Sequence, residues 1–407
     1  MRKLISLLLC FLFPSAYAMA DAATIMVASD LHYCAPSLYE GSDLFVRSIQ
    51  QGDGKVVHQS TELLRALLDQ ARRIRPDALV LTGDLTFNGE KQSHLELAAA
   101  LETLVDEGIA VYVLPGNHDI NNLSARRFIG ESYEAAESVT ADAFRSIYHR
   151  LMAPISESSA GLSYTVSLSN DLQLCMLDCA YYEPSAMVFG FLDENRYQFL
   201  ENALSQAERE GRRVVTATHH SVVPHSSLYQ ESFVILNSQR IRQALRDHGV
   251  TLHLSGHLHV QHIAEEDGLF DICSGALSVY PHRYGLVRLS GDGSVTYDAL
   301  PLSDDLLPDG FMDMSREWFR TTTSVKTSAS LEALNLSQHE IDDMLNYACD
   351  LNQAYFSGEL KRDDTAFRAD PAYALWQRSS EKLFFGRYLD LILSEASPDA
   401  LHLPWPE

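Results

Sequence analysis

The chain has 407 residues, of which 46% are hydrophobic, 9% aromatic and 21% charged, and its formal net charge is −24. This composition excludes a disordered or low-complexity protein, and the length allows one large domain with a smaller module beside it. An acidic surface of this kind repels polyanions at long range, which argues against a nucleic-acid groove.

The first twenty residues, MRKLISLLLCFLFPSAYAMA, have a basic start, an apolar stretch and then small residues. The apolar stretch is too short to span a bilayer, so residues 1–20 are predicted to be a cleaved signal peptide rather than an uncut anchor. We therefore expect a periplasmic or secreted protein with no membrane span after cleavage. The sequence leaves open which of the two locations applies, and also the oligomeric state.

Apolar runs rich in β-branched residues alternate with amphipathic stretches in the first part of the mature chain. Strands are predicted over 24–30, 77–84 and 109–116, and helices over 60–74 and 93–108 lie between them. This β-α-β-α-β order implies a parallel sheet, with its loops gathered at the carboxyl ends of the strands.

The middle of the chain is less regular but continues the mixture of strands and helices. Its predicted elements are helices over 139–152 and 193–209, a hairpin over 162–178, strands over 212–220, 250–259 and 270–280, and a hairpin that turns at 291–293.

Strand patterns stop near residue 303, and amphipathic helical stretches follow. We therefore predict a main domain over 21–302 and a helical C-terminal module over 303–407. From its position after the last core strands, we hypothesise that this module covers one side of the functional pocket and restricts its substrates.

Five short polar motifs fall at the ends of five predicted strands, where a parallel sheet places its functional site. The motifs are Asp30-Leu31-His32, Gly83-Asp84, Gly116-Asn117-His118-Asp119, His219 and Gly256-His257-Leu258-His259.

The spacing within these motifs suits metal binding. In an extended chain residues i and i+2 point the same way, so Asp30 and His32 could bind one ion together, while His257 and His259 could serve two adjacent ions. A carboxylate such as Asp84 can bridge two cations with its two oxygens. This Asp, His and Asn donor set favours Mn, Fe, Zn or Co over Cu(I), and a pair of such ions stabilises phosphoryl transfer.

The motifs D-x-H, GD, GNH[DE], H and GHxH, in this order, resemble the calcineurin-like metallophosphoesterase superfamily over roughly residues 24–302. The stretch GDLTFNGEKQSH…YVLPGNHDINN is similar to a secreted or periplasmic bacterial branch, related to class III cyclic-nucleotide phosphodiesterases. The resemblance implies a four-layer α/β/β/α sandwich with a binuclear metal centre. Phe87 stands where purple acid phosphatases carry a tyrosine ligand, so that subclass does not fit.

The resemblance also implies a role for each motif residue. One metal ion would be held by Asp30, His32, Asp84 and His259, and the second by Asp84, Asn117, His219 and His257. His220, next to His219, is expected to support the ligands rather than bind an ion.

His118 and Asp119 are the expected catalytic residues. A hydroxide bridging the ions would attack phosphorus, and His118 would protonate the leaving oxygen. Asp119 either supports His118 and caps the turn or acts directly. His225 either points toward the substrate or lies in a loop, and His253 is expected to be structural.

The expected activity is metal-dependent hydrolysis of a small phosphoester, with a diester favoured. Two alternatives stay open: a phosphomonoesterase of broad specificity, and a secreted binding or scaffold protein that keeps the fold without the activity.

Overall fold

The computed structural model describes residues 21–154, 161–228, 230–290, 294–332, 334–379, 383–396 and 400–404. The predicted signal peptide at 1–20 and the predicted turn at 291–293 lie outside the described residues.

The first sheet has six strands in the order β14-β13-β12-β1-β2-β3. β1 (Asp21–Ala28), β2 (Ala78–Leu81) and β3 (Ala110–Val113) run parallel, as the alternating pattern predicts. β12 (Arg283–Ser290) and β13 (Ser294–Pro301) form the predicted antiparallel hairpin beside β1.

The second sheet also has six strands, in the order β10-β11-β9-β8-β7-β6. β7, β8 and β9 are parallel neighbours, and β6 and β7 form the hairpin predicted over 162–178. The bounds are β6 (Tyr164–Ser167), β7 (Leu172–Met176), β8 (Arg213–Ala217), β9 (Leu252–Ser255), β10 (His262–Glu266) and β11 (Leu269–Cys273).

Helices cover the outer faces of the two sheets and complete a four-layer α/β/β/α sandwich. α3 (Lys91–Asp106) packs on β3 and beside α2 (Ser60–Ile74), whereas α5 (Glu194–Glu210) packs on β7 and β8 and α6 (Ser238–Asp247) on β11. Apolar side chains from both sheets, such as Leu79 and Leu174, join one buried cluster. This core fixes the relative positions of the strand ends.

The smaller elements α1, α4, β4 and β5 were only partly predicted. α4 (Ala141–Ile147) lies within the predicted helix over 139–152. The helix α1 (Asp43–Gln50) and the exposed hairpin of β4 (Arg126–Ile129) and β5 (Ser132–Ala135) were not predicted.

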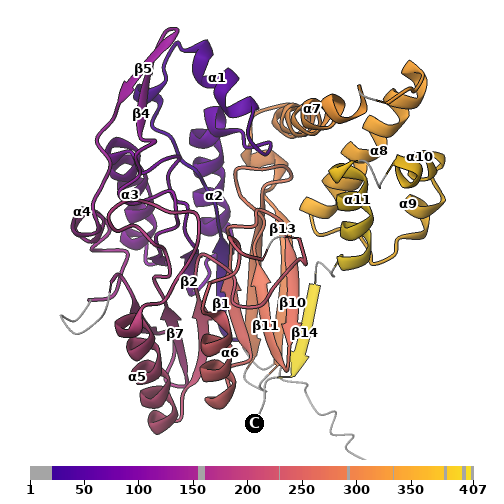
Figure 1. The fold of residues 1–407 in the computed structure, drawn as a ribbon. Helices are drawn as coiled ribbons and strands as arrows, with labels where there is room; N and C mark the ends of the chain where they lie inside the picture. Colours follow the sequence, from indigo (N-terminus) through magenta and orange to yellow (C-terminus); the bar gives the residue numbers. More distant parts are fainter. Residues whose placement is uncertain are drawn as a thin grey trace, which may run out of the picture.

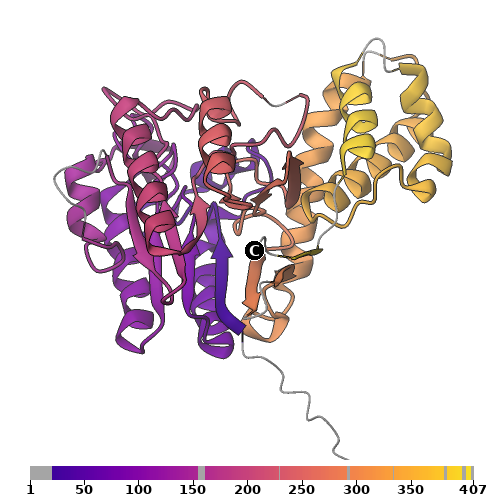
Figure 2. The same cartoon turned by 90° about the horizontal axis from the view of Figure 1, so that it is seen from below.

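The C-terminal region is helical, as predicted, and its helices gather at one side of the sandwich (Figures 1 and 2). Trp376, 1% exposed, anchors an apolar cluster that joins these helices to Val260 of the main domain, while Phe319 packs on Ala276 and Val279 of the same domain. The bounds are α7 (Phe311–Leu331), α8 (Gln338–Phe356), α9 (Thr365–Ala369), α10 (Pro371–Ser379) and α11 (Phe384–Glu395).

One strand follows these helices. β14 (Ala400–Pro404) returns to the first sheet and pairs antiparallel with β13 at its edge. It was not predicted, because five residues after a helical region carry too little periodicity and their pairing depends on the β13 edge. The last segment of the chain therefore belongs to the sandwich by hydrogen bonding.

The five cysteines of the described residues are buried and free, so none forms a disulfide with another. Within the same residues, no helix combines the length and apolar character that crossing a membrane requires.

Candidate metal centre

The five predicted motifs follow five strands of the two sheets and meet at one end of the sandwich. Asp30, Asp84 and Asn117 come shortly after β1, β2 and β3, while His219 and His257 follow β8 and β9. Because these strands are parallel within each sheet, their carboxyl ends converge and deliver the side chains to one place.

The backbone of these motifs is left-handed rather than extended. Asp30, His32, Asp84, His257 and His259 have φ values of 54°, 45°, 47°, 66° and 63°. The expectation that each i, i+2 pair shares a side in extended chain is therefore wrong in its geometry. Left-handed residues turn the chain sharply, so neighbouring side chains enter the site from a tight loop. Each such residue costs of order 1–3 kcal/mol, and such strain gathers at functional sites.

Two glycines allow the loops to approach one another. A Cβ on Gly116 would lie 2.2 Å from the amide nitrogen of Asp84, and a Cβ on Gly256 would lie 1.8 Å from Oγ of Ser29. Real Cβ atoms do not approach other atoms this closely, so only glycine fits at either position.

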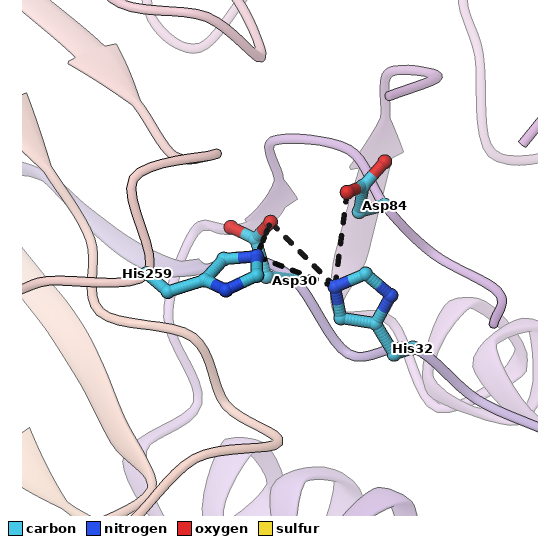
Figure 3. Close-up of side chains that lie close together, drawn as sticks. All are labelled: Asp30, His32, Asp84 and His259. Atoms are coloured by element: carbon cyan, nitrogen blue, oxygen red, sulfur yellow. Dashed lines mark hydrogen bonds and ion pairs between the residues drawn. The ribbon is translucent and has the colours of Figure 1, made fainter. Parts of the chain in front are cut away.

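The first group of possible ligands is Asp30, His32, Asp84 and His259 (Figure 3), whose donor atoms all lie within 4.8 Å of one another. Nε2 of His259 is 3.1 Å from Oδ1 of Asp30 and 3.4 Å from Nε2 of His32. Nε2 of His32 is in turn 3.7 Å from Oδ2 of Asp84. Four donor atoms from the ends of three strands, β1, β2 and β9, thus surround one point.

The second group is Asp84, His219 and His257, again within 4.8 Å. Nδ1 of His219 donates to the carbonyl of Thr82 at 2.8 Å, which leaves Nε2 facing Oδ1 of Asp84 at 3.4 Å. The side-chain oxygen of Asn117 lies 3.1 Å from the same Nε2. Asp84 therefore belongs to both groups, one through each carboxylate oxygen.

The donor set fits a metal ion. Oδ1 of Asp30 is buried and accepts no hydrogen bond from the described residues, which is costly for a carboxylate unless a cation is beside it. Burial lowers the pKa of His259, but the Asp53 and Asp30 carboxylates outweigh it and raise that pKa to about 10. In the same way Asp84 raises the pKa of His219 to about 9 against the effect of burial. Both raised pKa values show that the carboxylates of the site favour positive charge beside them, which a metal ion would also supply.

Asp53 was not predicted, although it contacts a candidate ligand directly. Its carboxylate accepts a hydrogen bond from Nδ1 of His259, which leaves Nε2 of the ring facing Asp30. A carboxylate behind a ligating histidine fixes the ring and raises its basicity. Asp53 stands in the loop GDGK, far from every motif, and no local pattern distinguishes it from a solvated loop residue.

His118 faces the same site from the loop after β3. Its backbone N–H donates to Oδ1 of Asp84 at 2.8 Å, and Nδ1 of its ring donates to the carbonyl of Phe87 at 2.8 Å. Because the carbonyl can only accept, Nδ1 carries the proton and Nε2 points to the site, 3.9 Å from Oδ2 of Asp84. Burial lowers the pKa of His118.

The contacts of Asp119 fit the first of its two expected roles, support of the turn. Its carboxylate is fully buried and belongs to neither ligand group. It accepts the backbone N–H groups of Leu85, Thr86 and Gly116 at 2.8–3.0 Å. Asp119 therefore ties the loop after β2 to the loop after β3.

Three further histidines have structural surroundings. His220 donates through Nε2 to the carbonyl of Val188 at 2.8 Å, and its ring packs against His257 at 4.1 Å. His253 is fully buried and bonds Thr216 and Thr218. His225 does not reach the ligand groups, since Nδ1 lies 3.0 Å from Nδ1 of His262 and Nε2 3.5 Å from Asp271.

A cavity of about 470 Å³ opens over the ligand groups. Its inner wall includes Asp84, Asn117, His118, His257 and His259. Its outer wall comes from helices α7, α8 and α11 and includes Lys326, Asn352, Phe384, Phe385 and Tyr388. This volume lies in the range of small-molecule sites, roughly 300–1,000 Å³.

Comparisons with known proteins agree with this arrangement. A profile described as calcineurin-like phosphoesterase matches residues 23–261, and one described as the C-terminal domain of cyclic nucleotide phosphodiesterase matches residues 304–399.

Individual relatives are more distant. A probable cyclic nucleotide phosphodiesterase from Ruthia magnifica subsp. Calyptogena magnifica is 24% identical over 224 residues, which cover 55% of this chain and 78% of the relative. One of the same name from Moraxella catarrhalis is 24% identical over 198 residues, covering 48% and 63%. A crystal structure of a dimetal phosphatase from Danio rerio has a TM-score of 0.50 at 17% identity, covering 70% of this chain and 97% of that one, and supports the fold.

Proposed function

The chain belongs to the calcineurin-like phosphoesterase family, which makes it a metal-dependent phosphoesterase, and from this premise we propose that it holds two metal ions and hydrolyses phosphodiesters. One observation carries the proposal: Asp84 is shared by two groups of possible ligands, each of which could hold one ion.

The ligand residues are proposed as the sequence motifs suggest. Asp30, His32, Asp84 and His259 would hold one ion, and Asp84, Asn117, His219 and His257 the other. When bound, the ions supply Lewis acidity and lower the pKa of the attacking water. Nitrogen and oxygen donors of this kind suit Mn, Fe, Zn or Co.

His118 is proposed to bind the phosphate and donate a proton to the leaving oxygen. Nδ1 of His118 donates its proton in a hydrogen bond to the Phe87 carbonyl, so Nε2 is the ring atom available on the cavity side. Burial lowers the pKa of His118, and a phosphate anion beside it opposes that shift by favouring the charged ring. Such a positioned acid contributes typically 10²–10⁴-fold to the rate.

The preference for a diester is supported by the relatives, whose names include cyclic nucleotide phosphodiesterase. The profile that matches residues 304–399 points to the same substrate class. A location outside the cytoplasm is proposed from the pattern of residues 1–20 alone.

The test uses the purified protein, stripped with a chelator and reloaded with Mn, Fe, Zn or Co. We expect two equivalents of metal and faster hydrolysis of bis(p-nitrophenyl) phosphate than of p-nitrophenyl phosphate. Asp84→Ala should abolish turnover, and His118→Ala should lower kcat by about 10²–10⁴-fold with both ions retained. Asp142→Ala, whose side chain is 91% exposed, is the matched control and should match the wild type.

Each failure has a distinct meaning. One equivalent of metal would contradict the binuclear centre. A faster monoester reaction would select the phosphomonoesterase alternative. Two bound ions with no hydrolysis of either ester would favour a binding or scaffold protein.

A further inference from the structure

We propose that Asn88 is a positioning residue for His118, whose imidazole ring it holds with Nε2 directed toward the cavity over the ligand groups. This role rests on the proposed function for the task of His118 itself. It adds a partner that belongs to none of the five sequence motifs.

Two oxygen atoms from one turn of the chain face Nδ1 of His118. The carbonyl oxygen of Phe87 lies 2.8 Å from Nδ1, and Oδ1 of Asn88 lies 3.1 Å from the same nitrogen. Because the carbonyl can only accept, Nδ1 carries the proton and donates to both oxygens. Nε2 is then the ring nitrogen left for a substrate, and His118 lines the cavity.

The turn that carries Asn88 is itself held in place. Its backbone N–H donates to Oε2 of Glu90 at 3.0 Å, and the N–H of Gly89 donates to Oγ1 of Thr86 at 3.1 Å. Glu90 is 1% exposed. Gly89 has a φ of +73°, and a Cβ there would lie 2.9 Å from the carbonyl oxygen of His118. The turn therefore packs directly against the backbone of the residue whose ring Asn88 contacts.

The backbone of His118 is fixed by contacts that do not involve its ring. Its N–H donates to Oδ1 of Asp84 at 2.8 Å, and its carbonyl accepts from Nδ2 of Asn122 at 3.0 Å. The rotation of the side chain is then what remains to be set, and the acceptors at Nδ1 set it. A general acid must lie within hydrogen-bond reach of the atom that it protonates, so this rotation decides whether His118 can act.

The two partners of Nδ1 are neutral, although carboxylates lie close by. Glu90 and Asp119 direct their carboxylates to backbone N–H groups of the loop after β2. A carbonyl and an amide keep the proton on Nδ1 without placing another negative charge beside the phosphate. A carboxylate at the position of Asn88 would hold the ring equally well but would repel the anionic substrate.

The first test detects the tautomer of His118 and does not depend on turnover. We would record the ¹⁵N spectrum of the zinc-loaded full chain with labelled histidine, and identify His118 by the signal that His118→Ala removes. The wild type should show a protonated Nδ1 and an unprotonated Nε2. Asn88→Leu, which is similar in volume but lacks the acceptor, should populate the other tautomer. Asn88→Asp, which keeps an acceptor oxygen, should retain the wild-type pattern.

The second test separates orientation from charge by kinetics on bis(p-nitrophenyl) phosphate. Asn88→Leu should lower kcat about tenfold with two ions still bound, because a misplaced acid transfers its proton less well. Asn88→Asp should largely keep kcat and raise KM, because its charge repels the phosphate. Asn202→Asp, the same change at an exposed side chain on α5, is the matched control and should equal the wild type in both constants.

A wild-type spectrum with the proton on Nε2 would overturn the role of Asn88. So would a wild-type tautomer retained in Asn88→Leu, whatever its kcat, and Asn88→Ala replaces that variant if it does not fold. Either result with normal diester hydrolysis by the wild type would leave the proposed function standing. The expected tautomers without hydrolysis of any ester would support the positioning of His118 and reject the proposed function.

Discussion

At the scale of single side chains, the state of each histidine is set by the group behind it. The carboxylate of Asp53 accepts a hydrogen bond from Nδ1 of His259. The carbonyls of Thr82 and Phe87 accept one from Nδ1 of His219 and of His118, respectively. Each contact leaves Nε2 directed into the site. The orientation of these histidines therefore depends on residues that are not part of the five sequence motifs.

Asp53→Asn tests this dependence. An amide accepts the proton of His259 more weakly than a carboxylate, so we expect the affinity for metal to fall about 10- to 100-fold. Competition with a chromogenic chelator would measure it. Asp142→Asn, the same change at a side chain that is 91% exposed, should bind metal like the wild type. Unchanged affinity in Asp53→Asn would show that His259 needs no support.

Glu90 provides a test that depends on pH. Burial raises its pKa to about 7 from an ordinary value of 4.5, while its Oε2 accepts the N–H of Asn88 at 3.0 Å. Between these two values the native state holds a proton that the unfolded chain releases, so this group makes stability fall as the pH rises.

Glu90→Gln keeps the hydrogen-bond acceptor and removes the titration. The unfolding free energy of the variant minus that of the wild type should therefore rise by about 2 kcal/mol from pH 5 to pH 8. Urea unfolding in the presence of a chelator would measure the difference. A constant difference between variant and wild type across this range would contradict the raised pKa.

At the scale of elements, the carboxyl ends of the strands carry the site because their loops can approach closely. Left-handed residues at Asp30, Asp84 and His257 turn the chain, and Gly116 and Gly256 remove the Cβ atoms that would collide. The strain of these loops is local, so we expect it to be offset by the sheets beneath and by bound metal.

Gly256→Ala should disturb this packing. The added Cβ would lie 1.8 Å from Oγ of Ser29 and 2.7 Å from Oδ2 of Asp30, so one of the two loops must move. We expect a loss of about 3 kcal/mol in unfolding free energy together with weaker metal binding. Chemical unfolding and metal titration would measure the two effects.

Gly268→Ala is the control for the cost of backbone strain alone. Its φ is +82°, but a Cβ there meets open space, so the change should cost only about 1 kcal/mol and leave metal affinity intact. Gly256 has no left-handed φ, so its loss should come from close approach. Equal losses in the two variants would contradict a cost of close approach at Gly256 beyond that of strain.

At the scale of the whole molecule, two parts of the chain build two walls of one cavity. The sandwich supplies the ligand groups, and helices α7, α8 and α11 supply the opposite wall. The apolar cluster around Trp376 also takes in Leu258 and Val260 of the sandwich, while β14 returns the chain to the first sheet. The helices therefore contact the loop that carries His257 and His259.

Trp376→Ala tests this contact. The side chain is 1% exposed and its Nε1 donates to the carbonyl of Met344 at 3.0 Å, so its removal should cost about 3–5 kcal/mol within the apolar cluster. Because Leu258 packs on that cluster and stands between two ligand residues, we expect metal affinity to fall as well, measured by calorimetry. Val325→Ala, a truncation of a side chain on α7 that is 63% exposed, should change neither stability nor metal affinity. Unchanged metal affinity in Trp376→Ala would show that the helices and the metal centre are independent.

The sequence by itself determined the alternation of strands and helices, the helical C-terminal region and the family, because hydrophobic periodicity and strand-end motifs are local signals. It also indicated the residues that gather into the two ligand groups. Their left-handed backbone, the carboxylate of Asp53 behind His259 and the pairing of β14 with β13 were decided only by the tertiary structure. The sequence left two roles open for Asp119 and offered cover of the pocket by the C-terminal module as a hypothesis, and the tertiary structure supplied the contacts that bear on both. Each of these depends on contacts between segments far apart in the chain, which leave no periodic pattern in either segment.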